Sequence, residues 1–405
     1  MTLLKQGIEN KSVIPTEMRK KIDIDNHIET YSVYKIKLDQ LYYNDQNDRI
    51  ATWIGQYKME NNIKSIDMSD ITNYNDIIHG FITESNREAL KNTQKNIKLI
   101  GQQEYGVVLA DGRIIDGNRR FTCLRNIEKE TGKTQYFEAV ILEHDFVYNA
   151  KQIKKLELRL QHGVDEKVDY NPVERLVGIY NDIVDKELLT VEEYADSVSK
   201  TKGEIEVEVE KAKLLVEYLE FINAPNQFHI ARTMNLSDPL KELYVILKKC
   251  KDKDVREDLK NVVFSQFLIQ PFGDMTRYIR KVKKIASSSK FLNKYLEEQL
   301  ELTEKVCDII EELPTVTSKE INEKIRTQED IKNAFTHSTD KWINKVDGDA
   351  TRNQPAKQAE KAYDSLDLID KNIFKKLSDD QKDDIRSKLD MIEEIILSIR
   401  SELDV

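Results

Sequence analysis

One short stretch, residues 107–124, combines a hairpin signal with the start of a helix, and it reads VVLADGRIIDGNRRFTCL. Asp111 and Gly112 lie between two apolar runs. Asp-Gly favours a two-residue type I′ turn, which needs positive φ at both turn positions. The sequence therefore predicts two paired strands, over residues 105–109 and 113–115.

A helix is predicted directly after this hairpin, from Gly117 to about residue 132. Its apolar residues recur at three-residue spacing, which is typical of one helix face: Phe121, Leu124 and Ile127. Arg119 and Arg120 then lie on the first helical turn, where unpaired N–H groups and the helix dipole favour anions. Forked guanidinium donors suit phosphate, although surface carboxylates could pair with them instead. Asp116 is either the N-cap of this helix or a catalytic carboxylate.

Composition sets the general class of the protein. The chain has 405 residues, of which 34% are charged, and only 13 Gly and 7 Pro, which indicates two or three domains and a mostly helical chain. The net charge of −10 argues against a protein that coats DNA along its whole surface, but leaves room for a local basic face. Three cysteines without pairing or metal-ligand spacing fit a reducing compartment. No apolar run is long enough for a membrane span or a signal peptide, so we expect a cytoplasmic protein.

The pattern along the chain predicts an α+β fold, with a small mixed α/β domain followed by a mostly α-helical remainder. Alternating and helical segments follow one another up to about residue 145, and helical patterns dominate afterwards. We expect an irregular arm over residues 1–29 and the mixed domain over 30–165. A helical domain is expected over 166–286, and a helical bundle or dimerisation region over 287–405, with serines 287–289 at the joint.

Two capping-box patterns, starting at Thr190 and Thr201, predict two helices joined by a short turn. Such a pair resembles a helix-turn-helix. Four glutamates between residues 204 and 210 would be repelled by DNA phosphates. We therefore expect this pair to be structural or protein-binding.

A basic run at residues 277–284 is the better candidate for contact with nucleic acid. Its cations are interleaved with aliphatic and aromatic residues, as contacts to a phosphate backbone require. The alternative is a solvated helix face. The cations are Arg277, Arg280, Lys281, Lys283 and Lys284.

The C-terminal part is acidic and helical, and we expect Pro314 and the segment 348–355 to break it into pieces. Its last piece has apolar residues at alternating steps of four and three, which is a heptad seam. This helix could belong to a bundle or form a dimer contact. The seam consists of Ile385, Leu389, Ile392, Ile396, Ile399 and Leu403.

The central stretch also resembles a known family. Gly117-Asn118-Arg119-Arg120 is similar to the Gly-Glu-Arg-Arg box of the ParB N-terminal domain, whose fold is shared with sulfiredoxin. Asp111 to Leu124 looks like the Asp-Gly-Asn-Arg-Arg variant of plasmid, phage and genome-island relatives. The resemblance covers roughly residues 30–230. It implies that Gly117, Asn118, Arg119 and Arg120 cradle the phosphates of a nucleotide, typically CTP.

Two flanking boxes extend the resemblance. Residues 47–49 look like the Asn-x-Arg box, and residues 157–161 look like the third box. The resemblance implies that Arg49 and Gln161 bind nucleotide, and that Glu157 is catalytic or holds Mg²⁺. Leu158 stands where the family has the Asn that shares this role. The turn lacks the cysteine of sulfiredoxin-type chemistry, because Cys123 comes a helical turn later. The same resemblance puts His144, Asp145 and His162 near the box, as structural or assisting groups.

These observations predict a nucleotide-operated switch protein that binds CTP or ATP, with or without Mg²⁺, and hydrolyses it slowly at most. Its setting would be a DNA-linked process of a plasmid, a phage or a defence element, with a second copy or a helical protein as partner. Three alternatives stay open. They are a DNA-binding partition or transcription regulator, a metal-dependent nuclease or phosphotransferase using Asp116 or Glu157, and a protein–protein adaptor with a vestigial pocket.

Overall fold

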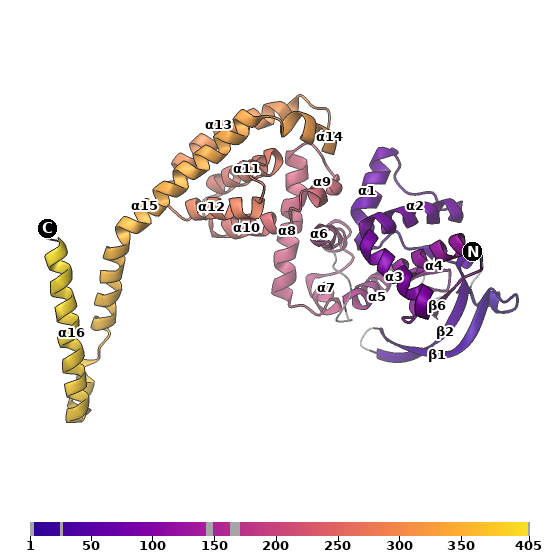
Figure 1. Ribbon diagram of the computed structural model, residues 1–405, viewed down its shortest axis with the longest axis horizontal. Coiled ribbons are helices and arrows are strands. Elements are labelled where there is room, and N and C mark those ends of the chain that lie inside the picture. The colour runs from indigo at the N-terminus through magenta and orange to yellow at the C-terminus, as the bar shows by residue number, and fades with distance from the viewer. Residues whose placement is uncertain (1–3, 25–26, 143–148, 163–170, 404–405) are drawn as a thin grey trace. The chain divides into compact units, whose positions relative to one another are not determined.

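The computed structural model describes residues 4–24, 27–142, 149–162 and 171–403. The chain divides into two compact units, residues 1–343 and 344–405. The first unit begins with a six-stranded mixed sheet and continues in helices (Figure 1), which confirms the predicted α+β fold. The predicted domain boundary at 165 lies outside the described residues.

The sheet has the strand order β1-β2-β6-β4-β5-β3. β1 pairs with β2, β2 with β6 and β4 with β5 in antiparallel fashion, whereas β6 pairs with β4 and β5 with β3 in parallel. The strands that surround the central turn therefore form the middle of the sheet. The strands are β1 (Val13–Ile24), β2 (His27–Lys37), β3 (Tyr42–Tyr43), β4 (Gly106–Leu109), β5 (Arg113–Asp116) and β6 (Tyr136–Leu142).

The irregular arm predicted over residues 1–29 is wrong for Val13–Ile24, which forms the edge strand β1. Most of its side chains are at least partly exposed, so β1 lacks the apolar alternation that reveals a strand in sequence. Its register shifts between Pro15 and Arg19. A proline, a bulge and charged side chains are the devices that keep an edge strand from pairing with other chains.

Both faces of the sheet are buried at β4, where successive side chains point to opposite sides and all four residues are buried. Val108 packs into a core with Phe121 of α4 (Asn118–Thr131) and Tyr74 of α2 (Ile71–Ser85). Val107 and Leu109 pack on the other face against α5 (Ala150–His162). The middle of the sheet thus lies between α5 and the helices α2 and α4.

The predicted hairpin is present, but its turn is not type I′. Gly112 has a φ of +96°, whereas Asp111 has no positive φ. The Gly112 N–H donates to the Leu109 carbonyl at 3.0 Å. The Asp111 carboxylate instead accepts the Tyr42 hydroxyl at 2.8 Å and the Arg113 N–H at 3.0 Å. These two bonds hold Asp111 in an ordinary conformation and leave the positive φ to the glycine alone.

The helix predicted after the turn is present as α4. α4 begins at Asn118, so Arg119 and Arg120 do lie on its first turn, and the helix ends before Gly132, which has a φ of +66°. The other elements are the 3₁₀ turns η1 (Leu4–Ile8), η2 (Leu38–Gln40) and η3 (Asp48–Ile50), and the helices α1 (Ala51–Glu60) and α3 (Arg87–Ile100).

The helical part of the first unit contains both predicted capping boxes, at Thr190 and Thr201. Serines 287–289 lie between two helices of this one unit, so the joint predicted there is not a boundary between compact units. The elements are α6 (Pro172–Ile179), π-helical η5 (Tyr180–Asp185), α7 (Val191–Ser197), α8 (Lys202–Phe221), α9 (Phe228–Thr233), α10 (Ser237–Lys249), α11 (Lys253–Ile269), α12 (Met275–Ala286), α13 (Leu292–Glu311), α14 (Ser318–Glu320) and π-helical η6 (Ile321–Ile325).

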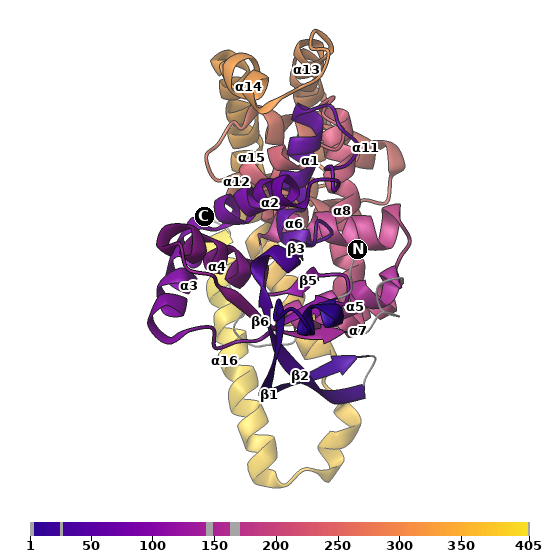
Figure 2. The same ribbon diagram turned by 90° about the vertical axis from the view of Figure 1, so that its right-hand side faces the viewer.

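The predicted break at 348–355 is also absent, because α15 runs unbroken from Glu329 to Asp367 with Pro355 inside it. This segment is largely exposed, so water can satisfy the carbonyl that a proline leaves unpaired. In the second unit α16 (Asp379–Leu403) follows η7 (Lys371–Lys376) and runs antiparallel to the end of α15 (Figure 2). No helix in the described ranges is long and apolar enough to cross a membrane.

Replacing Gly117 by alanine should lower the free energy of unfolding by about 1–3 kcal/mol, because Gly117 has a φ of +104° and an added Cβ would lie 2.7 Å from Phe137 Cζ. Gly203→Ala is the matched control, since that helical glycine has open space around it and should gain up to about 1 kcal/mol. Urea unfolding followed by circular dichroism measures both. Equal stability of wild type and Gly117→Ala would contradict the strained turn.

Candidate functional site

The turn between β5 and α4 brings the predicted phosphate-binding residues together. Gly117 holds the left-handed conformation that lets the chain pass from strand to helix, and Asn118 is the first helical residue. The Gly117 carbonyl accepts the Phe121 N–H at 2.9 Å, which closes the first helical turn. The N–H groups at this helix start are therefore available to an anion.

Asp116 is not the helix N-cap. It is the last residue of β5, and the N-cap position is Gly117. Its carboxylate accepts a hydrogen bond from Arg120 at 2.9 Å and lies 3.8 Å from the Lys20 ammonium. Arg120 also donates to the Glu104 carbonyl at 2.5 Å. Because both cations hold it, Asp116 is a structural ion-pair partner here and a poor candidate for a catalytic base.

Arg119 differs from Arg120. Its side chain is half-buried, and no acidic side chain in the described ranges pairs with it. Burial lowers the pKa of Arg119, and the positive charge of Arg49 lowers it further. Asn118 beside it is 8% exposed, and its Oδ1 accepts no hydrogen bond within the described part of the chain. Two guanidinium groups close together in a partly buried place favour a bound anion.

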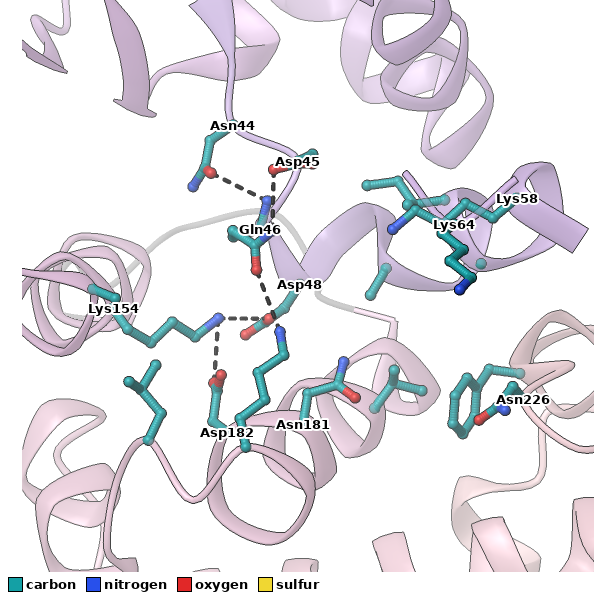
Figure 3. A pocket seen from close by; sticks show the side chains of 18 of the residues that line it. Asn44, Asp45, Gln46, Asp48, Lys58, Lys64, Lys154, Asn181, Asp182 and Asn226 are labelled. Atoms are coloured by element: carbon teal, nitrogen blue, oxygen red, sulfur yellow. Dashed lines mark hydrogen bonds and ion pairs between the residues drawn. The ribbon is translucent and has the colours of Figure 1, made fainter. Parts of the chain in front are cut away.

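A pocket of about 770 Å³ lies beside this region, between η3, α1, α5, η5 and the segment before α9. Glu157 and Asp48 line it, and Figure 3 shows Asp48 at its wall. Gly117, Asn118, Arg119, Arg120, Arg49 and Gln161 do not line it. The residues that the sequence predicts to form one nucleotide site therefore lie in two places, the pocket and the turn before α4. Asp48 lines the pocket, and its neighbour in η3, Arg49, lies near Arg119 of the turn.

The pocket wall contains a buried ion cluster around Lys154. The Lys154 ammonium lies 2.6 Å from Asp48 Oδ1, 3.2 Å from Asp182 Oδ2 and 3.8 Å from Glu157 Oε2. Figure 3 shows Lys154 reaching from α5 between Asp48 and Asp182. All four side chains are at most 7% exposed. Glu157 also accepts a hydrogen bond from Gln161 at 2.9 Å.

The charges of this cluster do not balance, since three carboxylates share one ammonium. Burial lowers the pKa of Lys154, but the carboxylates outweigh it and hold that pKa well above the ordinary value, so the lysine stays charged. Burial raises the pKa of Glu157 to about 8, and Lys154 only partly offsets this. Burial likewise raises the pKa of Asp182 to about 6. A carboxyl group with a pKa of about 8 mostly keeps its proton at neutral pH, so Glu157 is not poised to accept a proton from a substrate there.

The Mg²⁺ that the family resemblance implies does not fit Glu157. Its Oε2 accepts no hydrogen bond, and its nearest cation is the Lys154 ammonium. Mg²⁺ binds oxygen at about 2.0–2.1 Å and keeps several waters, whereas Glu157 is 1% exposed. Within the described ranges no group of three or more His, Cys, Asp and Glu side chains is placed to hold a metal. The prediction of Glu157 as a metal ligand is not supported by this geometry.

The basic run lies on α12, and most of its cations have acidic partners. Arg280 and Lys283 both contact Glu242, at 2.8 and 2.9 Å, and Lys281 contacts Asp340 at 2.8 Å. Lys284 is exposed but also has a partner, and Arg277 is exposed. These pairs neutralise much of the charge that phosphate contacts would need.

Cys123 does not have the surroundings of a catalytic thiol. Cys123 is buried, its thiol contacts the Leu90 carbonyl at 3.5 Å, and burial raises its pKa to about 12. A thiol so held is a core residue and not a nucleophile. His144 and Asp145 lie outside the described residues, as does the side chain of His162.

Sequence reasoning missed Lys154, Asp48 and Asp182. Lys154 and Glu157 stand three residues apart on a predicted helix, where such a pair is ordinarily an exposed i,i+3 contact. The one available signal was Lys154 on the apolar side of α5, between Ile153 and Leu158. Its other partners come from distant parts of the sequence.

Replacing Lys154 by methionine should lower the free energy of unfolding by about 3–5 kcal/mol, because it leaves buried carboxylates without their cation. The control is Lys155→Met, since Lys155 is partly exposed and pairs with Glu193, and its loss should cost less than about 1 kcal/mol. Denaturant titration of both variants at pH 7 measures the difference. A similar decrease in the free energy of unfolding of the two variants would show that the Lys154 cluster stabilises the fold no more than an exposed ion pair does.

Comparisons with known proteins do not assign this site. No protein-family model matches the chain, and no curated protein sequence matches it.

Proposed function

We propose that this protein is a ParB-like nucleotide-binding switch, which binds a nucleoside triphosphate (CTP or ATP) at Gly117, Asn118, Arg119 and Arg120 together with Arg49. Slow hydrolysis of the nucleotide is compatible with this role but is not its purpose. The protein would act in the cytoplasm, in a DNA-linked process of a bacterial plasmid, a phage or a defence element.

The observation that carries this proposal is the charge arrangement at Arg119. A half-buried guanidinium lies near a second one, Arg49, and has no acidic partner within the described ranges. Asn118, whose Oδ1 accepts no hydrogen bond from the described residues, is the first residue of the same helix. Phosphate oxygens would relieve the repulsion between the arginines and accept the free N–H groups, and a ribose or base donor would satisfy Asn118.

A switch also needs a connection from this site to the helical part, and α1 supplies one. The 3₁₀ turn with Arg49 continues directly into α1. At the start of α1 the Thr52 N–H donates to Glu174 at 3.0 Å, and Arg232 donates to the Thr52 hydroxyl at 2.6 Å. The Arg232 guanidinium also lies 3.8 Å from the ring centre of Trp53. A shift of Arg49 towards a bound phosphate would therefore move contacts to α6 and α9.

A second copy of the chain is the partner we propose for α16. Leu389 and Ile399 of the heptad seam are 43% and 56% exposed, and Leu403 is 78% exposed. A helix with such a stripe buries it against another helix. In a parallel pairing with Leu389 at heptad position a, Lys388 of one copy faces Glu393 of the other, which favours self-association.

Arg119→Ala should weaken nucleotide binding about ten- to hundredfold, because it removes charge-assisted hydrogen bonds to phosphate. Retention of labelled CTP, ATP, GTP and UTP by wild type and variant measures this. Arg87→Ala is the control, since Arg87 is exposed and pairs only with Glu84 in the described structure, and it should bind as the wild type does. Equal retention by all three proteins would remove the nucleotide site and favour the adaptor alternative.

Ile392→Asp should convert a self-associated protein to monomers, because it places a charge in the middle of the seam. Leu397→Asp is the matched control, since Leu397 is 60% exposed and lies off the seam on the same helix. Light scattering on a size-exclusion column gives the mass of each. A monomeric wild type at micromolar concentration would refute the self-association.

A further inference from the structure

The pocket of about 770 Å³ is a second place in which a ligand could bind. Neither Gly117 nor Arg119 lines it, so phosphates bound at the turn before α4 do not account for it. Its volume lies within the range of small-molecule sites, about 300–1,000 Å³. The chemistry of its walls therefore indicates which class of molecule it fits.

Two buried donors of the pocket wall lack an acceptor. Asn44 is 1% exposed, and its Oδ1 accepts the Gln46 N–H at 3.1 Å (Figure 3), which leaves its Nδ2 without a partner in the described part of the chain. The buried Nε of Arg113 has no acceptor there either. Both residues belong to one sheet edge, because β3 pairs with β5. Buried donors ordinarily have an acceptor, so this edge fits a ligand oxygen.

Three lysines bring positive charge to the pocket. Lys58 on α1 is half-buried, whereas Lys64 and Lys186 are exposed. Figure 3 shows Lys58 and Lys64 across the pocket from Lys154. These two form no ion pair with a described residue, and Lys186 donates to the Gln46 side-chain oxygen at 3.3 Å.

The acidic side chains of the pocket do not offset this charge, because they already have partners. Asp48 and Asp182 lie 2.6 and 3.2 Å from the Lys154 ammonium, and Asp45 accepts a hydrogen bond from the Gln46 side chain at 3.1 Å. Because burial raises its pKa to about 8, Glu157 mostly keeps its proton at neutral pH and adds little negative charge. The charge that remains is positive and favours an anion.

Apolar side chains complete the wall. Met59 and Ile63 line the pocket although they are 42% and 37% exposed, and Phe228 beside them is half-buried. Ile54 and Ile153 form a buried part of the wall. Small-molecule sites combine such apolar area with a few placed polar groups.

We propose that this pocket binds a small organic anion, an apolar ring or chain that carries a carboxylate or phosphate group. The anionic group lies beside Lys58 and Lys64, the body lies against the apolar wall, and a second oxygen accepts hydrogen bonds from Asn44 and Arg113. This inference does not depend on the nucleotide site at Arg119, because the two sites share no residue.

The test uses the fluorescent probe 8-anilinonaphthalene-1-sulfonate, an organic anion with an aromatic body, on the full chain. Wild type should bind it saturably with a Kd of about 10⁻⁴ M or tighter. Changing Lys58→Gln and Lys64→Gln together should weaken binding about tenfold, because both cations beside the anionic group are lost. The matched control is Lys91→Gln with Lys95→Gln. It removes the same charge from exposed positions of α3 that do not line the pocket, so its Kd should equal that of wild type.

A second variant fills the pocket without changing its charge. Gly55 lines the pocket on α1, and a Cβ added there meets only the Asn226 carbonyl oxygen, at 3.9 Å. Gly55→Leu should therefore fold and abolish probe binding. Gly80→Leu is its control, because Gly80 on α2 has open space around it and does not line the pocket.

Loss of binding in both pocket variants, with both controls unchanged, supports the inference. Absence of saturable binding by wild type overturns it, as does binding that survives the lysine changes or a folded Gly55→Leu, because the probe would then lie elsewhere or the cavity would not prefer anions. If Gly55→Leu fails to fold, the lysine pair against its control decides. Displacement of the probe by benzoate assigns a carboxylate ligand, displacement by phenyl phosphate assigns a phosphate monoester, and displacement by neither refutes the proposed ligand class.

Discussion

The Lys154 ammonium is the contact on which the joining of sheet and helices depends. Its three carboxylates come from η3 after the sheet edge, from α5 itself and from π-helical η5. All are buried, so removing one partner would leave a buried charge that water cannot solvate. The π-helical geometry of η5 belongs to this arrangement, because Asp182 lies within it and its carbonyl accepts the N–H groups of Leu188 and Leu189.

The turn η3 links this cluster to the arginine pair. Asp48 is held at 2.6 Å by Lys154, and the next residue, Arg49, acts on Arg119. Gly178 packs so closely on Asp48 that an added Cβ would lie 2.6 Å from its carboxylate carbon. Asp48, the residue before Arg49, is therefore held in place on the pocket side of η3. The two sides of η3 therefore differ in charge. On one side the carboxylates around Lys154 retain a cation, and on the other side Arg49 and Arg119 favour an anion.

The parts of the fold that sequence could predict are those with local causes. The strands beside Gly112 and the helix after Gly117 follow from alternation and spacing within a few residues. β1 escaped prediction, because an edge strand with mostly exposed side chains lacks that alternation and is defined by its partner. At Pro355 the sequence predicted a break that the structure does not have. An exposed helix tolerates a proline when water replaces the backbone hydrogen bond that the proline removes.

For charged side chains, too, the local sequence gives the position and distant residues give the partner. This explains why α4 and α12, which both carry several basic residues, differ in structure. On α12 the Arg280 side chain is 63% exposed and meets Glu242, a residue 38 positions earlier that no spacing rule connects to it. On α4 the half-buried Arg119 meets another cation. An exposed ion pair is screened by solvent and has little further need of an anion, whereas a half-buried guanidinium with no acidic partner in the described ranges, such as Arg119, favours one. What marks an anion site is therefore not the density of arginines in a helix but whether the fold has already given each of them a carboxylate.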